Sequence, residues 1–316
     1  MYYPYFRGKQ YELLALRDTA GLLGVEQSVR PIIEPVRQPE NSGLDRCLGA
    51  LKSAHVAATL VVNPSVGDLK GDSALSSLSL HLASADANQP AMLGLILSDS
   101  SDVRSLFGAY SRKFGSRYDL ALLHKAAHPD IDYIREWAAT HNAKMNVIQN
   151  GLRRRHFDSI IPSAQAVTIR DAFVSEPRNA EFLERQESVF TDDHLFYAED
   201  GWAGFSDYLT VGEPFATGGF QPRAVVIHWT FEREVGGPVM IRHFTSVSNA
   251  DTADVAGKFL QALDKLVAFL DSRDLQTRAA TVMREHARNR TYPGLGTLKK
   301  LSIQNHLELM SGILAR

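Results

Sequence analysis

The chain has 316 residues, of which 44% are hydrophobic and 22% are charged, a composition typical of a folded globular protein. Because 34 basic residues face 36 acidic ones and there is one cysteine, the composition excludes a globally basic polyanion-binding protein, an internal disulfide and a cysteine-rich zinc site. No apolar run is long enough to span a bilayer and the first residues lack a signal-peptide pattern, so we expect a cytoplasmic protein without a membrane segment.

Short apolar runs rich in β-branched residues alternate with helical stretches, and each run ends in a polar or charged residue. This alternation is typical of βαβ units and a parallel sheet. The predicted strands are Tyr2–Arg7, Pro31–Val36, Thr59–Asn63, Met92–Asp99, Asp119–His124, Lys144–Asn150, Ala166–Asp171 and, less regularly, Phe205–Gly212. The sequence therefore predicts an α/β protein with a (β/α)8 TIM-like barrel that is irregular at its last unit.

Two local patterns between the strands have structural interpretations. Asp102 precedes a helical stretch, where its side chain is expected to cap the free amides of the first turn. Cys47 lies within a helical pattern, which favours a small packing residue over a nucleophile. The stretch 173–190 is interpreted as one further helix.

The chain after residue 222 has a different pattern. The runs 223–234 and 237–248 alternate in hydropathy and are joined through Gly236 and Gly237, a direct hairpin signal. From Thr252 onward the pattern is helical. We expect a barrel over residues 1–222, and over residues 223–316 a hairpin that extends or caps the barrel and helices that pack on it, the whole forming one compact domain.

Loops at the carboxyl ends of the strands build the sites of (β/α)8 barrels, so the residues that close the strands are the functional candidates. Four of them are acidic: Glu34, Asp99, Asp171 and Asp207. Carboxylates from several strand ends are able to hold a divalent metal such as Mg²⁺, for which Glu34, Asp171 and Asp207 are the candidates. The alternative is that they cap helices or form ion pairs.

A second group of closing residues suits an anionic ligand. The basic members are Arg7, Lys9, Lys125 and Arg170, and Asn63 and Asn150 add amides. Converging arginine and lysine side chains bind phosphate, phosphodiester or carboxylate groups. Mutual neutralisation with the carboxylates is the alternative, and the run Arg153–Arg155 is interpreted as a solvated face or the start of a helix.

Histidines supply the third group. His124 closes a predicted strand and is placed for general acid or base chemistry, although a histidine that satisfies a neighbouring backbone group is the equal alternative. His228 and His243 lie on the hairpin, where cross-strand packing is expected, and His306 lies on a C-terminal helix. The chain has no P-loop, no GxSxG elbow and no HExxH motif.

The opening YYPYFRGKQYELLAL, with RPIIEPV, WAGFSDYLTVG and the late YPGLGTLKKLSIQNHLELM, resembles the family named after a phage "beta protein". The corresponding motif positions are Arg7, Gly8 and Lys9, then Glu34, and later Ser206, Asp207 and Tyr208. Where the family often has Arg-Tyr-Thr, this chain has His228, Trp229 and Thr230. The resemblance implies a bacterial or phage-borne protein associated with phage defence, and it favours Asp207 and Tyr208 as a functional pair.

Our leading hypothesis is a barrel that binds a phosphorylated or nucleotide-type anion at the rim, as a phosphodiester hydrolase in phage defence. Glu34 and Asp207 would act as base or metal ligands, and His124 or Tyr208 would assist proton transfer. The alternative is a non-catalytic recognition subunit of an anti-phage system, which binds a protein partner from the same defence locus through its hairpin, the Arg153–Arg155 run and its C-terminal helices.

Overall fold

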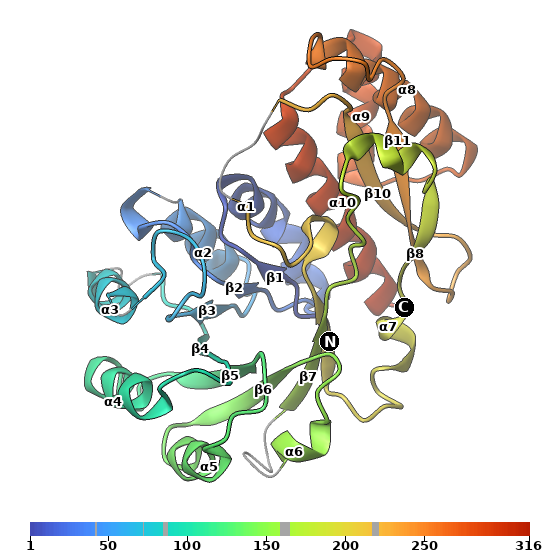
Figure 1. Cartoon of the computed structure of the whole chain (residues 1–316). Coiled ribbons are helices and arrows are strands. Elements are labelled where there is room, and N and C mark those ends of the chain that lie inside the picture. The colour runs from blue at the N-terminus through green and yellow to red at the C-terminus, as the bar shows by residue number, and fades with distance from the viewer. Residues whose placement is uncertain (42, 72, 85–87, 159–164, 217–220) are drawn as a thin grey trace. The chain divides into compact units, whose positions relative to one another are not determined.

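The structure is a computed structural model that describes residues 1–41, 43–71, 73–84, 88–158, 165–216 and 221–316 (Figure 1). The chain forms two compact units. The first comprises Met1–Leu13, Ala20–Arg170 and Phe196–Asp207, and the second comprises Leu14–Thr19, Asp171–Leu195 and Tyr208–Arg316. The predicted division after residue 222 stays a prediction, and each unit is described by itself below.

Eight parallel strands form one sheet in the first unit, in the order β1-β2-β3-β4-β5-β6-β7-β9. Their bounds are Tyr5–Phe6 (β1), Ile32–Ile33 (β2), Thr59–Val61 (β3), Met92–Leu97 (β4), Asp119–His124 (β5), Ala143–Gln149 (β6), Gln165–Arg170 (β7) and Gly204–Asp207 (β9). Parallel bridges from Tyr2 to Val29 and to Phe205 join the two ends of this order, so the sheet is nearly closed into a barrel. The predicted (β/α)8 TIM-like fold is confirmed.

Helices follow the strands on the outside of the barrel (Figure 1). They are α1 (Gln10–Glu26), α2 (Leu44–Ser53), α3 (Ala74–Ser84), α4 (Val103–Lys113), α5 (Ile131–Ala139) and the short α6 (Arg154–Asp158), with a 3-10 helix η1 at Pro39–Asn41. A further short helix, α7 (Asp193–Phe196), belongs mostly to the second unit. The expected cap is confirmed, because Asp102 accepts a hydrogen bond from the Ser105 amide at 3.0 Å. Cys47 is fully buried on α2, as its packing interpretation requires.

A second, three-stranded antiparallel sheet lies in the second unit, in the order β10-β11-β8. Its strands are β8 (Glu187–Thr191), β10 (Val226–Glu232) and β11 (Val239–Thr245). The predicted hairpin between β10 and β11 is confirmed, and Gly236 adopts φ +78° in its turn. Of the two alternatives expected for the hairpin, extension of the barrel sheet is wrong, because β10, β11 and β8 form a sheet of their own. That the hairpin caps the barrel stays a prediction.

The stretch 173–190 does not form the predicted helix. It contains only a 3-10 helix, η2 (Asn179–Leu183), before β8 begins at Glu187. The run of Val189, Phe190 and Thr191 favours a strand, and pairing with β11 supplies the partner that makes the strand form. Another 3-10 helix, η3 (Leu209–Val211), follows β9.

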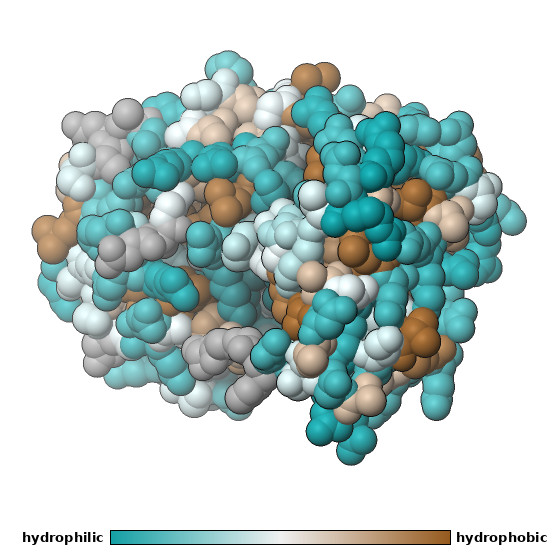
Figure 2. Space-filling model, turned by 90° about the horizontal axis from the view of Figure 1, so that it is seen from above, coloured by the Kyte–Doolittle hydropathy of each residue, from teal (hydrophilic) through white to brown (hydrophobic). Residues whose placement is uncertain are grey.

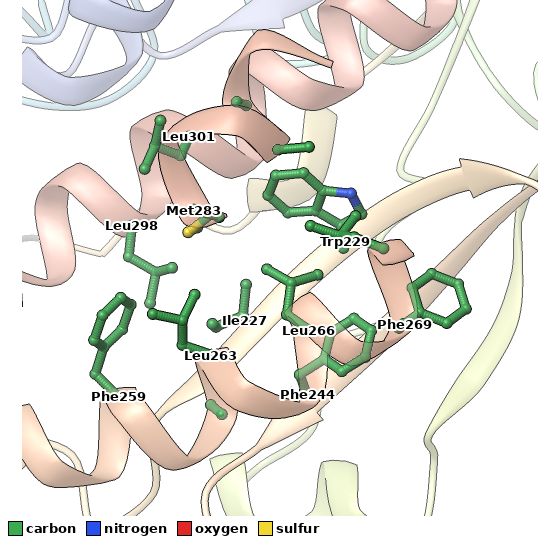
Figure 3. Close-up of a cluster of buried hydrophobic side chains, with 14 of the residues drawn as sticks. Ile227, Trp229, Phe244, Phe259, Leu263, Leu266, Phe269, Met283, Leu298 and Leu301 are labelled. Carbon is green, nitrogen blue, oxygen red and sulfur yellow. The ribbon is translucent and has the colours of Figure 1, made fainter. Parts of the chain in front are cut away.

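Three C-terminal helices, α8 (Val255–Ser272), α9 (Arg278–Asn289) and α10 (Leu295–Leu314), enclose a core with β10 and β11 (Figure 3). Alternate residues of β10, Ile227 and Trp229, point into it, as the period of two in a strand requires. Leu263 and Leu266 of α8 face them from the helical side. The packing surface of the predicted helices is therefore this second sheet.

The backbone of β10, an edge strand, is covered by polar side chains of α10. Ser302 Oγ donates to the carbonyl oxygen of His228, and Asn305 Nδ2 donates to that of Thr230 at 2.8 Å. Asn305 Oδ1 in turn accepts from Thr277 Oγ1 at 2.9 Å, so the amide is held at both ends. Edge carbonyls that would otherwise lack partners are thereby satisfied.

On the face drawn in Figure 2, hydrophilic residues predominate and hydrophobic residues lie in small separate groups. The most exposed large apolar side chains of the described residues are Val235, Val25, Leu80 and Val247, which come from distant parts of the sequence. Isolated apolar residues of this kind are normal on a protein surface. None of the helices in the described ranges combines the length and hydropathy that crossing a membrane requires.

Candidate functional site

The candidate site lies at the carboxyl ends of the barrel strands, where the backbone places charged residues from different parts of the chain. Arg7 directly follows β1, Glu34 follows β2 and Lys125 follows β5, whereas Arg170 and Asp207 are the last residues of β7 and β9. Arg170 and Asp207 are also register partners across the β7–β9 pair. Parallel strands thus bring these predicted site residues to one end of the barrel, as expected.

Glu34 is the centre of a buried hydrogen-bond network and is 0% exposed. Its Oε1 accepts from the backbone amide of Ser65 at 2.6 Å and from the Ser65 hydroxyl at 2.7 Å. Its Oε2 accepts from the Tyr5 hydroxyl at 2.7 Å and forms an ion pair with Arg7 Nη1. Because both oxygens are occupied, the carboxylate holds three neighbouring side chains in place.

Two glycines let the chain approach the end of β2 closely enough to build this network. Gly8 adopts φ +60°, and a Cβ there would lie 2.9 Å from the carbonyl oxygen of Glu34. Gly67 adopts φ +82°, and a Cβ there would lie 2.3 Å from the carbonyl oxygen of Val36. These are positions where a side chain is excluded both by backbone conformation and by space.

The Tyr5 ring brings together cations from two strand ends. Arg7 Cζ and Lys125 Nζ each lie 5.5 Å from its centroid, a distance at which the ring face attracts a positive charge. Lys125 Nζ also donates to Gln149 Oε1 at 3.3 Å, which links the ends of β5 and β6. The end of β1 therefore meets the ends of β5 and β6 through one aromatic side chain.

His124 is 1% exposed and lies beneath this rim at the end of β5. Its Nε2 is 2.9 Å from Asn146 Oδ1, and since an amide oxygen only accepts, Nε2 carries the proton that is donated. The Phe157 ring lies 4.5 Å from the imidazole, centroid to centroid. The geometry matches a histidine fixed in one orientation by β6.

Asp207 takes part in closing the barrel. It is 2% exposed, and its Oδ1 accepts from the Tyr2 hydroxyl at 2.7 Å. The Tyr2 ring stacks on Phe205 with centroids 5.2 Å apart. Burial, followed by the negative charge of Asp207, raises the pKa of Tyr2 well above its ordinary value, so this hydroxyl keeps its proton and remains a donor.

The remaining predicted residues have other surroundings. The Asn63 amide bonds the backbone of Ile96 in both directions, donating at 2.9 Å and accepting at 2.8 Å, which extends the pairing of β3 with β4. Lys9 is half-buried at the N-cap position of α1, where its carbonyl oxygen accepts from the Glu12 and Leu13 amides. Asn150 is exposed after β6.

Asp171 and Tyr208 belong to the second unit. Asp171 accepts from the backbone amides of Phe173 at 3.1 Å and Glu213 at 2.9 Å, so it organises a turn. The Tyr208 hydroxyl donates to Glu213 Oε1 at 3.1 Å. Among the residues that the structure describes, no three histidine, cysteine, aspartate or glutamate side chains gather as a metal site would require.

Three contributors to the network around Glu34 and His124 were not predicted: Tyr5, Ser65 and Asn146. Tyr5 stands two residues before Arg7 in the same extended segment, and that spacing places two side chains on one face. Asn146 has a similar signal, as a polar residue within the apolar run of β6. Ser65 lies in a loop and has no comparable signal.

No family model and no curated protein matches this chain. The resemblance to the phage beta-protein family therefore stays a prediction from the motifs around Arg7, Glu34 and Asp207.

Proposed function

We propose that the barrel binds a small phosphorylated or nucleotide-type anion at the carboxyl ends of its strands. The observation that carries the proposal is the meeting of Arg7 and Lys125 at the Tyr5 ring, with each cation 5.5 Å from the ring centroid. Ligand sites of (β/α)8 barrels lie at this end, and the loops after the last strands commonly hold phosphate.

In this proposal the residues have different tasks. Arg7 and Lys125 supply positive charge, and Arg170, half-buried at the end of β7, adds a third cation. Glu34 orients Arg7 and Tyr5 through its oxygen Oε2. Because its Oε1 is occupied by Ser65, Glu34 is a positioning residue, and this favours binding of the anion over base catalysis by Glu34.

Hydrolysis of a phosphodiester and a role in phage defence remain the wider hypothesis. The buried His124 and Asp207 are the residues that would move a proton in such a reaction. The resemblance to the beta-protein family supports the proposed role in phage defence. That resemblance is independent of the geometry that supports anion binding.

Calorimetric titration with adenosine monophosphate and with inorganic phosphate tests the binding proposal. We expect Lys125→Met and Arg170→Met each to weaken binding about tenfold or more, since a charged hydrogen bond contributes about 1.5–3 kcal/mol. Lys144→Met and Arg112→Met are matched controls, because both side chains are exposed and neither lies at the carboxyl end of a strand. Equal affinities for all four variants, or no heat with either ligand, would exclude this function.

A further inference from the structure

A cavity of about 200 Å³ opens beside β11 in the second unit. It is lined by Phe182 and Leu183 of η2, by Gln186, by four consecutive residues of β11 and by Lys265 of α8. Cavities that hold drug-sized molecules have volumes of about 300–1,000 Å³. The size therefore fits a small ligand.

Two of the lining residues are cationic. Arg242 lies with its Cζ 4.8 Å from the Phe269 ring centroid, and its Nη1 donates to Glu187 Oε2 at 3.3 Å. Lys265 Nζ donates to the carbonyl oxygen of Thr245 at 2.7 Å. These contacts hold both cations beside the cavity and give its polar side a positive charge.

His243, which lines the same cavity, is paired with a second histidine, His228. His228 and His243 are register partners on β10 and β11, and their Nδ1 atoms are 2.7 Å apart, so one of the two carries a proton that the other accepts. The ring of His243 packs on Phe182, with centroids 4.4 Å apart. Since Nδ1 is used within the pair, Nε2 is the ring nitrogen of His243 that remains for a ligand.

The charge state of this histidine suits a hydrogen-bonding role. Burial, followed by the charge of Arg185, lowers the pKa of His243 to about 4. At neutral pH the ring is uncharged and offers one donor or one acceptor, according to which member of the pair holds the shared proton. A shift of that proton changes what Nε2 presents to the cavity.

Thr245 closes the cavity on the β11 side. It lines the cavity and is 2% exposed, and its hydroxyl oxygen is buried, with no hydrogen-bond partner among the described residues. The polar contacts that the cavity offers a ligand therefore come from Arg242, His243 and Lys265.

We propose that this cavity binds a small organic carboxylate with a short apolar body. The carboxylate would lie between Arg242 and Lys265, and the body would pack on Phe182, Leu183 and Phe244. His243 Nε2 would hydrogen-bond the head group. The apolar walls distinguish this ligand from inorganic phosphate, and the site is separate from the anion site proposed for the barrel.

Benzoate titrated into the full-length protein is the test. Binding is measured through the ¹⁵N NMR resonances of the histidine side chains. We expect saturable shifts of the His243 and His228 signals. Lys265→Met and Arg242→Met should each weaken benzoate binding about tenfold, because each removes a charged partner of the carboxylate. The exposed Lys113 and Arg112 of α4, changed to methionine, are matched controls and should leave the affinity within about twofold.

Two results would overturn the proposal. One is the absence of shifts up to about 50 mM benzoate, far above a Kd of about 1 mM that marks weak binding. The other is an unchanged affinity in both cavity variants. Inorganic phosphate should displace benzoate poorly. If phosphate competed as well as unlabelled benzoate does, the apolar walls would contribute nothing to binding. Lys125→Met should leave benzoate binding intact, which separates this test from that of the barrel site.

Discussion

Tyr2 and Asp207 are joined by a hydrogen bond of 2.7 Å between the phenolic hydroxyl and Oδ1, across the seam where the first and last segments of the barrel meet. Both side chains are buried, at 0% and 2% exposure. The bond therefore links two residues 205 positions apart in the sequence. Closure of the barrel and placement of a candidate site residue depend on the same contact.

Tyr2→Phe should destabilise the protein, because it leaves a buried carboxylate oxygen without its donor while keeping the ring stacked on Phe205. The expected loss is about 1–3 kcal/mol in the free energy of unfolding, measured by urea denaturation. Tyr11→Phe is the matched control, since Tyr11 is 36% exposed. If both variants were equally stable, the hydrogen bond between Tyr2 and Asp207 would contribute negligibly to the free energy of unfolding.

Glu34→Gln should be more costly than most substitutions, because the buried Arg7 would lose its ion pair with Glu34. The expected loss is about 3–5 kcal/mol. In the double variant Glu34→Met with Arg7→Met no unpaired charge is left, so it should be more stable than Glu34→Gln when both are unfolded by urea. If the double variant were instead less stable than Glu34→Gln, the Arg7–Glu34 pair would contribute to stability through packing and not only through its charges.

Gly8→Ala should destabilise the barrel through both backbone strain and a clash with the carbonyl oxygen of Glu34. Gly43→Ala is the control for strain alone, because Gly43 has φ +76° but a Cβ there meets no atom of the described residues within 4 Å. We expect about 1–2 kcal/mol for Gly43→Ala and a larger loss for Gly8→Ala in thermal or urea unfolding. Equal losses of stability in the two variants would show that the backbone at Gly8 moves away from the end of β2 without cost.

The histidine pair should make the second unit sensitive to acid. Burial lowers the pKa of His228 well below its ordinary value and that of His243 to about 4. Below pH 6.5 the unfolded chain therefore binds more protons than the folded one, and stability falls as the pH drops from 6.5 towards 4. The cations Arg185 and Lys299, which further lower these pKa values, act in the same direction.

Unfolding by urea at several pH values between 4 and 7 measures this effect. The double variant His228→Asn with His243→Asn should show a flatter profile than the wild type. His55→Gln changes an exposed histidine and should leave the slope unchanged. A wild-type profile no steeper than that of the double variant would contradict the assignment.

Prediction from sequence was most accurate where local pattern and tertiary structure agree. The strands β4 to β7 are continuous buried runs, as both faces of a parallel sheet are covered, and their predicted limits lie within two residues of the observed ones. The helix expected over residues 173–190 failed because β8 depends on pairing with β11, a contact that local sequence does not encode.

The candidate site could be predicted only in part, for a related reason. Strand ends identified Arg7, Glu34 and Lys125, because the position of a residue along a parallel strand determines the end of the barrel at which it lies. The contribution of Ser65 depends on the path of the loop after β3, which Gly67 permits by approaching Val36 closely. Such an approach between segments about thirty residues apart has no periodic signal in the sequence.

The side chains of Ser302 and Asn305 along β10 have one more consequence. By bonding the outward carbonyls of His228 and Thr230, they take the place that an additional strand would occupy. The three-stranded sheet therefore has a blocked end at β10, and a chain that lost α10 would present a bare template to other molecules. We therefore expect the last helix to oppose self-association through strand addition at β10.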